Sequence, residues 1–136
     1  MDTLFSLKTE EDLATYAKRR LEVEIKVTKF LIDLKCPPHY SGYTYLKDII
    51  VQVIMANNKG KTIDKTVWQN TAAKFGTSAN NIERCVRTMI NAWWDRFRVS
   101  ELFPEKPTCR ECALLCAEYI SLGLSPDYET PNGKKK

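Results

Sequence analysis

The chain has 136 residues, of which 43% are hydrophobic, which suits one domain with a single core and excludes a multidomain enzyme. Charged residues make up 28%, and the longest nearly unbroken apolar stretch, residues 49–56, is far shorter than the roughly 20 residues of a membrane span. No leader sequence is apparent, and the five cysteines do not fit a secreted disulfide scaffold. We expect a cytoplasmic protein with reduced thiols and no membrane association.

The net charge of +4 is concentrated in the middle of the chain. Residues 57–98 carry eight basic and three acidic side chains, a net charge of +5, whereas residues 99–133 carry two basic and six acidic side chains, a net charge of −4. A localised basic segment is typical of a surface that binds a polyanion. A solvated basic surface is the alternative interpretation at this point.

Residues 9–35 have a helical pattern. Thr9 is a good cap residue, and the three acidic residues after it suit the positive end of a helix dipole. Apolar residues then recur at helical spacing until Pro37-Pro38, which ends the helix near Lys35. The apolar stripe changes phase near Glu22, so the pattern allows either one long helix or two shorter ones. The apolar positions are Leu13, Tyr16, Ala17, Leu21, Val23, Val27, Phe30, Leu31 and Leu34.

A further helix is predicted for residues 45–54, where apolar residues spaced by three and four cover a face wide enough for a central core element. β-branched residues are frequent here, so a strand is the alternative, but the spacing over about three turns favours a helix. Turn-forming residues 57–60 end it. No glycine-rich strand-turn-helix unit is present, so we predict an all-α domain with a flexible tail over residues 123–136.

Residues 66–87 have the pattern of a helix-turn-helix. This motif needs a small residue where the two helices approach, a residue that tolerates positive φ at the corner, and apolar residues that close the angle. Ala72 is the small residue, Gly76 lies at the corner, and Ser78 is placed to cap the second helix. The residues expected to close the angle are Phe75, Ile82 and Cys85.

The second helix of this motif, from about Ser78 to Asp95, separates into an apolar face and a polar face. The polar face carries amides, arginines and a hydroxyl, which form hydrogen bonds with purine edges and phosphates, whereas a solvated helix typically mixes Glu and Lys. We expect this face to contact DNA, with Glu83 at its border, able to bind a cytosine amino group or to pair with Arg87. The apolar face comprises Ile82, Cys85, Val86, Met89, Ile90 and Trp93, and the polar face Asn80, Asn81, Arg84, Arg87, Thr88 and Asn91.

Several segments between residues 25 and 119 resemble segments of a known family. They are IKVT (25–28), PHYSGYTYL (38–46), AKF (73–75), IERCVR (82–87), Trp93, LF (102–103) and KPT (106–108). This part of the chain resembles the C-terminal DNA-binding effector domain of the stage-zero sporulation response regulator. The resemblance implies a compact bundle of about six helices around a helix-turn-helix and a homodimer on tandem promoter sites. It places an effector-like domain at residues 25–122, after an additional helical segment at residues 1–24, and family contacts with DNA at Glu83, Arg84 and Arg87.

Three features differ from that family. Asn81 stands where the family has a base-reading arginine, and an amide suits adenine rather than guanine. The segment after Trp94 is several residues shorter, in the region that resembles the family's surface for the RNA polymerase sigma factor, so we do not expect that contact. The residues before Ile25 do not resemble the phospho-acceptor receiver domain, so we expect no control by aspartyl phosphorylation within this chain.

The spacing of Cys109, Cys112 and Cys116 suggests a metal or redox site, but zinc requires a fourth ligand, and the candidates for it are far away in sequence. Cys112 and Cys116 instead fit the apolar stripe of a final helix that begins after Thr108. We expect these thiols to lie in the core, and we expect no metal, no cofactor and no enzymatic activity.

The sequence thus predicts a transcription regulator that reads duplex DNA in the major groove with the helix from about Ser78 to Asp95. The alternative is a protein-binding module that pairs with a full-length regulator or another partner without reading DNA, and the additional N-terminal segment and the acidic segment 99–133 favour it. The residues expected to read bases are Asn80, Asn81, Glu83 and Arg84, and those expected to bind phosphate are Lys59, Lys61, Lys65, Arg87 and Thr88.

Overall fold

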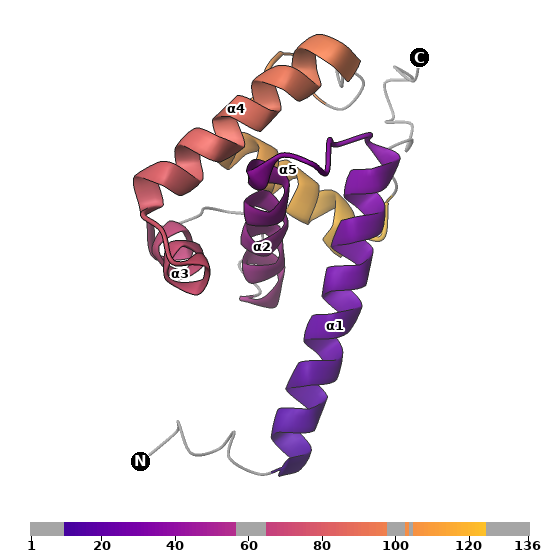
Figure 1. The fold of residues 1–136 in the computed structure, drawn as a ribbon. Coiled ribbons are helices and arrows are strands. Elements are labelled where there is room, and N and C mark those ends of the chain that lie inside the picture. The colour runs from indigo at the N-terminus through magenta and orange to yellow at the C-terminus, as the bar shows by residue number, and fades with distance from the viewer. Residues whose placement is uncertain (1–9, 57–64, 98–102, 104, 125–136) are drawn as a thin grey trace.

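The computed structural model describes residues 10–56, 65–97, 103 and 105–124, and regular structure in these ranges is entirely helical (Figure 1). The helices are α1 (Glu10–Asp33), α2 (Ser41–Met55), α3 (Lys65–Phe75), α4 (Ala79–Phe97) and α5 (Cys109–Ser121). The predicted all-α fold class is confirmed, but the described residues form five helices, whereas the resemblance implies about six. None of these described helices combines the length and the apolar character that a membrane span requires.

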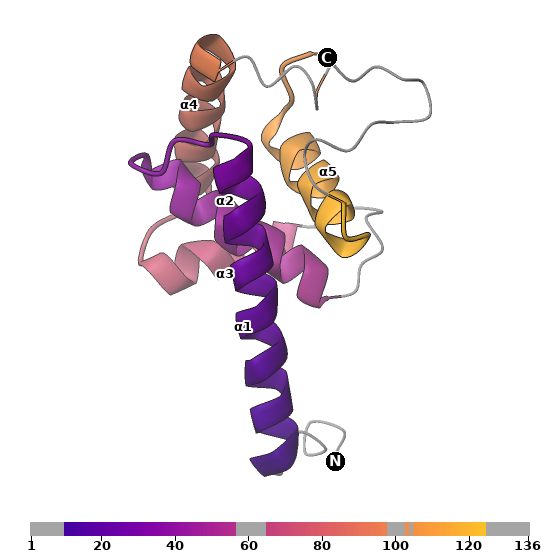
Figure 2. The same cartoon turned by 90° about the vertical axis from the view of Figure 1, so that its right-hand side faces the viewer.

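α1 is unbroken, which decides between one helix and two for this segment. It contains neither proline nor glycine, so the phase change near Glu22 does not interrupt it. Its buried residues, Val23, Val27, Phe30 and Leu31, all lie in the C-terminal half. The N-terminal half extends past the other helices and away from the core (Figure 2). The predicted boundary between residues 24 and 25 therefore falls inside one helix.

The end of α1 is fixed by Lys35, which adopts the left-handed conformation with a φ of 63°. The Lys35 N–H donates to the Ile32 carbonyl oxygen over 2.9 Å, and the Cys36 N–H donates to the Leu31 carbonyl oxygen over 3.0 Å. These two bonds satisfy carbonyl groups of the last helical turn. The chain then turns, and the buried Cys36 thiol donates to Met89 Sδ in α4 over 3.6 Å. The C-terminal end of α1 is thereby held beside α4.

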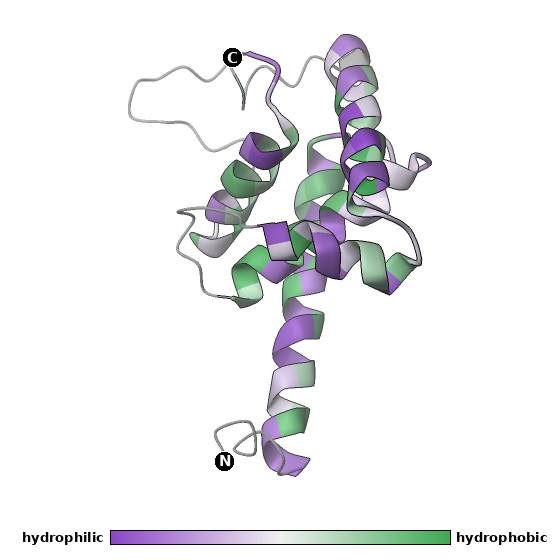
Figure 3. Ribbon diagram, turned by 90° about the vertical axis from the view of Figure 1, so that its left-hand side faces the viewer, coloured by the Kyte–Doolittle hydropathy of each residue, from purple (hydrophilic) through white to green (hydrophobic). Residues whose placement is uncertain are grey.

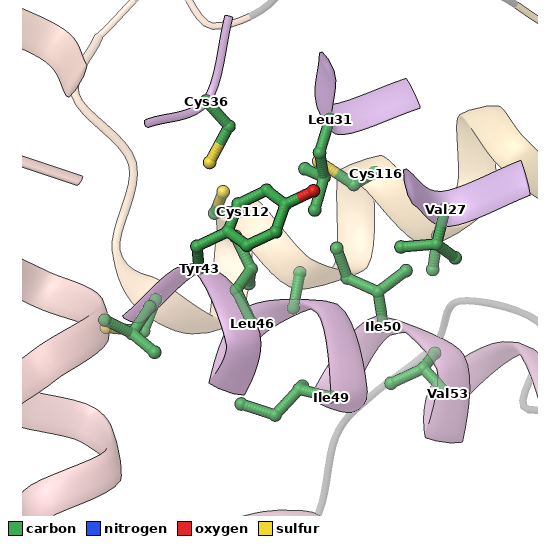
Figure 4. Close-up of a cluster of buried hydrophobic side chains, with 14 of the residues drawn as sticks. Val27, Leu31, Cys36, Tyr43, Leu46, Ile49, Ile50, Val53, Cys112 and Cys116 are labelled. Atoms are coloured by element: carbon green, nitrogen blue, oxygen red, sulfur yellow. The ribbon is translucent and has the colours of Figure 1, made fainter. Parts of the chain in front are cut away.

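α2 is the central helix, as predicted, since it contacts each of the other four described helices. Leu46, Ile49 and Ile50 are fully buried. Figure 4 shows them in one cluster with Val27 of α1 and Cys116 of α5. Because α2 packs against both α3 and α4, it sets the position of both helices of the predicted motif.

α5 begins after Thr108, as predicted, with a reciprocal cap at its first turn. The Thr108 hydroxyl oxygen accepts from the Glu111 N–H over 3.1 Å, and the Glu111 carboxylate accepts from the Thr108 N–H over 3.0 Å. Cys112 and Cys116 are fully buried, so the prediction that they belong to the core is confirmed. Within the described ranges, no group of three or more His, Cys, Asp or Glu side chains is placed to hold a metal ion.

Candidate nucleic-acid interface

α3 and α4 are joined by residues 76–78, the place of the turn in the predicted helix-turn-helix (Figure 1). Gly76 has a φ of 69°, which glycine adopts without steric penalty, and the Thr77 N–H donates to the Ala72 carbonyl oxygen over 2.9 Å. Ala72, the predicted small residue, is buried. Phe75 differs from the prediction, because it is 37% exposed and packs beside the ring of Tyr45, at 5.3 Å between centroids, instead of closing the angle.

The first turn of α4 is capped by Ser78, as predicted. The Ser78 hydroxyl oxygen accepts from the Asn81 N–H over 3.1 Å. The Asn81 side chain bonds back to the turn as well, since its Nδ2 donates to Thr77 Oγ1 over 2.9 Å. Together these bonds fix the direction in which α4 leaves the turn.

α4 has one buried and one exposed face, and hydrophilic and hydrophobic residues alternate along it in Figure 3. The predicted apolar face is buried at Ile82, Val86, Met89, Ile90 and Trp93, and Cys85 is half-buried. On the predicted polar face Asn81 is half-buried. The exposed residues there, together with the bordering glutamate, are Asn80, Glu83, Arg84, Arg87, Thr88 and Asn91. The predicted separation of two faces is therefore confirmed, while contact with DNA stays a prediction.

Asn81 is engaged within the protein. Its Oδ1 accepts from the Arg84 guanidinium and from the Cys85 thiol, the latter over 3.7 Å, while its Nδ2 donates to Thr77. In this structure the amide supports Arg84. A guanidinium has five N–H donors, so the bond to Asn81 leaves Arg84 with donors for a ligand.

Glu83 and Arg87 form an ion pair one helical turn apart, at 3.7 Å, with both side chains more than half exposed. The structure thus shows the second of the two partners that the sequence allows for Glu83. Exposed pairs of this kind contribute little free energy, so a phosphate group can compete for Arg87. The backbone at Glu83 is held from the other side, because the Cys109 thiol of α5 donates to its carbonyl oxygen over 3.6 Å.

Three of the residues expected to bind phosphate are described, and all three are exposed: Lys65, Arg87 and Thr88. Arg87 and Thr88 lie on α4, whereas Lys65 is the first residue of α3. The N-terminus of a helix favours anions, so Lys65 stands where a phosphate would be attracted. Lys59 and Lys61 lie outside the described residues.

Asp48, which the sequence analysis did not single out, is buried in α2 and holds α3 in place. Its Oδ1 accepts from Lys74 Nζ over 2.9 Å and from Arg20 Nη2 over 3.3 Å. Its Oδ2 accepts from Thr71 Oγ1 over 3.0 Å and from Gln52 Nε2 over 2.7 Å. Burial raises the pKa of Asp48, but the hydrogen bonds from Lys74, Gln52 and Thr71, with the charge of Lys74, outweigh it and lower the pKa below its usual value. One ionised carboxylate therefore joins α1, α2 and α3.

Gly42 belongs to the PHYSGYTYL segment, but its contact with α4 was not predicted from the sequence. It lies in the first turn of α2, where a β-carbon would be 2.5 Å from the Cys85 carbonyl oxygen and 3.0 Å from Met89 Cβ. Glycine therefore allows the backbone of α2 to approach that of α4 at this crossing.

Gly42→Ala is expected to lower the free energy of unfolding by about 1 to 3 kcal/mol, because the added methyl group forces two packed helices apart. Denaturant titration measures the loss, and amide chemical shifts measure the displacement of α4. Ser41→Ala, at the exposed neighbouring residue, is the control and is expected to change stability by at most about 0.5 kcal/mol. Equal stability of the two variants would show that α2 and α4 do not meet at Gly42.

A model of the family described as sporulation initiation factor Spo0A C terminal matches residues 27–110, which is more than half of the chain. The matched segment contains the end of α1, all of α2, α3 and α4, and the first residues of α5.

The chain belongs to the Spo0A C-terminal domain family. This family is a DNA-binding effector domain of sporulation and of transcription regulation, and it is not an enzyme family. The resemblance inferred from the sequence is thus confirmed. The Spo0A match includes both helices around the 76–78 turn, whereas α1 up to residue 26 lies outside it.

Proposed function

We propose that this protein is a sequence-specific regulator of transcription and that α4 inserts into the major groove of duplex DNA. The observation that carries the proposal is the division of α4, whose apolar face is buried while its opposite face exposes amides, guanidinium groups and a hydroxyl. An α-helix fits the major groove, where each base pair presents a distinct pattern of donors and acceptors. Membership of a DNA-binding effector family supports the proposal.

In this proposal Asn80, Glu83 and Arg84 contact base edges, since they lie near the N-terminus of α4, the part of a recognition helix that usually reaches the bases. Arg84 suits guanine, because a guanidinium donates two parallel hydrogen bonds to O6 and N7. Asn80 suits adenine. The Asn81 Nδ2 group has two hydrogens, and one of them is bonded to Thr77. The second hydrogen can donate to a base while Oδ1 continues to accept from Arg84.

In this proposal phosphate groups are bound by Arg87, Thr88 and Lys65. For Lys59 and Lys61 the same role is proposed from the sequence alone. Such contacts fix the register of the protein on the duplex but do not distinguish base pairs. They release counterions on binding, so the affinity for any duplex should fall steeply as the salt concentration rises.

Arg84→Ala is expected to weaken binding to a preferred duplex by about 1 to 3 kcal/mol and to relax the preference at one base pair. The preferred duplex is first selected from a random pool, and anisotropy titrations at fixed salt then measure the affinity for it and for its single-base variants. Lys29→Ala is the matched control, because it removes one positive charge from α1, where Lys29 pairs with Asp33. The assignment of Arg84 fails if both variants bind every duplex alike.

A protein-binding module that does not read DNA remains the competing assignment, and the exposed apolar residues of α1 favour it. A gel-shift series at low salt, with random and selected duplexes, distinguishes the two. Retardation of the selected duplex with a steep salt dependence supports the DNA-binding regulator. Absence of retardation for every duplex would favour the protein-binding module.

A further inference from the structure

The outer half of α1, residues 10–22, contains no buried residue, although the line of positions that the inner half buries has two apolar residues there, Leu13 and Tyr16. Positions spaced alternately by three and four residues form one seam along the helix. They are Leu13, Tyr16, Arg20, Val23, Val27 and Phe30. The core covers the inner part of the seam, where Val23, Val27 and Phe30 are buried, but Leu13 and Tyr16 in the outer part are 52% and 49% exposed.

The outer half is held to the core near its inner end. Arg19 Nη1 lies 3.4 Å from Met55 Sδ, and Arg20 Nη2 lies 3.3 Å from Asp48 Oδ1. Farther out the seam is solvent-exposed in the described part of the chain. Short helices in water are only marginally stable unless an apolar face is packed, so a partner surface on this seam would stabilise the outer half.

The charges of the outer half identify the partner. Glu10, Glu11 and Asp12 occupy the first turn, and Lys18 and Arg19 follow about two turns later, next to Arg20, which already pairs with Asp48 and Glu24. A second copy of this helix in parallel orientation would bring like charges together. In antiparallel orientation, the acidic turn of each copy lies beside the basic cluster of the other. The segment is therefore complementary to its own reversed copy in both charge and apolar pattern.

We propose that the outer half of α1 pairs in antiparallel orientation with the outer half of α1 in a second copy of the chain. The contact is isologous, so each interaction occurs twice about a two-fold axis. When the two seams face each other, Leu13 of one copy lies opposite Tyr16 of the other. This register brings Asp12 beside Arg19, because these residues are seven apart and flank the seam on the same side.

This pairing goes beyond the proposed function and does not depend on DNA. The outer half of α1 and α4 lie at opposite ends of the molecule (Figures 1 and 2). Self-association through α1 therefore leaves the exposed face of α4 uncovered in both copies. The paired residues also lie outside the segment that matches the Spo0A C-terminal family.

Sedimentation equilibrium of the full chain without DNA is expected to show a monomer–dimer equilibrium. Leu13→Glu should raise the dimer dissociation constant at least about tenfold, because it buries a charge in the seam twice. Ile32→Glu is the matched control, since Ile32 is 59% exposed on the same helix but lies off the seam, and it should change the constant by less than about twofold. A monomer at all concentrations up to about 1 mM, or equal effects of both variants, overturns the proposal.

Charge reversal tests the orientation. Asp12→Lys and Arg19→Glu should each raise the dissociation constant about fivefold or more, because each replaces two attractive contacts with two repulsive ones. The double variant should restore the wild-type constant to within about twofold, since opposite charges again meet across the antiparallel pair. In a parallel pair residues 12 and 19 do not meet, so failure of the double variant to recover would overturn the antiparallel arrangement. Circular dichroism of each variant checks that the helices are retained.

Discussion

Asp48→Ala is expected to lower the free energy of unfolding by about 3 kcal/mol, because Thr71 and Gln52 lose their acceptor, at about 1 to 3 kcal/mol for each donor left unsatisfied. The Asp48 side chain is 6% exposed, and its loss leaves the buried Thr71 hydroxyl without its acceptor and removes the bond from Lys74 to α2. Denaturant titration measures the effect. The matched control is Asp33→Ala, whose carboxylate is 41% exposed and pairs with Lys29 at 3.2 Å, and it should cost less than about 1 kcal/mol. A loss at Asp48 no larger than at Asp33 would mean that the carboxylate does not hold α3.

The same carboxylate makes stability depend on pH. Burial acts to raise the pKa of Asp48, but the hydrogen bonds and the charge of Lys74 bring it below the usual value of about 3.9 that applies in the unfolded chain. The stability that this group contributes is therefore complete above the unfolded pKa and is lost as the pH falls through the folded pKa. Unfolding titrations across this acid range should show the loss in the wild type, and Asp48→Asn should remove that part of it.

Trp93→Ala is expected to lower the free energy of unfolding by about 3 to 5 kcal/mol, because it leaves a large cavity between α4 and the end of α1. The Trp93 side chain is 1% exposed, and its Nε1 donates to the Leu34 carbonyl oxygen over 3.0 Å. Trp93→Phe keeps most of the volume and loses the hydrogen bond, so it should cost about 1 to 3 kcal/mol. Denaturant midpoints of both variants measure the two contributions.

Trp94→Ala is the control for this prediction. Trp94 is the next residue of α4 but is only half-buried, so its removal should lower the free energy of unfolding clearly less than that of Trp93. Equal losses at the two positions would contradict the burial of Trp93 between α4 and α1. Trp93 lies on the face of α4 opposite Arg84. If folded Trp93→Phe binds DNA almost as tightly as the wild type, then Trp93 supports the helix and does not contact the duplex.

Local sequence signals were sufficient for the positions of the helices. The spacing of Ile82, Val86 and Met89 predicts which face of α4 is buried, and Ser78 and Thr108 predict where α4 and α5 begin, because caps and periodicity act within a few residues. The site therefore follows from the sequence as an exposed stripe on one helix.

Contacts between distant segments could not be predicted in the same way. Asp48 meets Thr71, 23 residues later, and Gly42 meets Cys85 on another helix, and no local pattern shows which segments approach. The sequence offered only two signals for these contacts. One was a single acidic residue between the apolar Leu46 and Ile49, and the other was a glycine near the start of a helix. The exposure of the outer part of α1 was also not predictable, since it arises because α1 has 24 residues and its neighbour α2 has only 15.

Burial controls how Cys36, Cys109 and Cys112 react with alkylating reagents and oxidants in the folded protein. Burial raises the pKa of Cys36 and, with the charge of Glu83, raises that of Cys109 to about 11, while the hydrogen bond with Cys116 and burial raise the pKa of Cys112. Only the thiolate is an effective nucleophile, so these three sulfur atoms are chemically inert at neutral pH while the core is closed. Alkylation of these thiols requires local or global unfolding. The rate of alkylation therefore measures how often the native core opens.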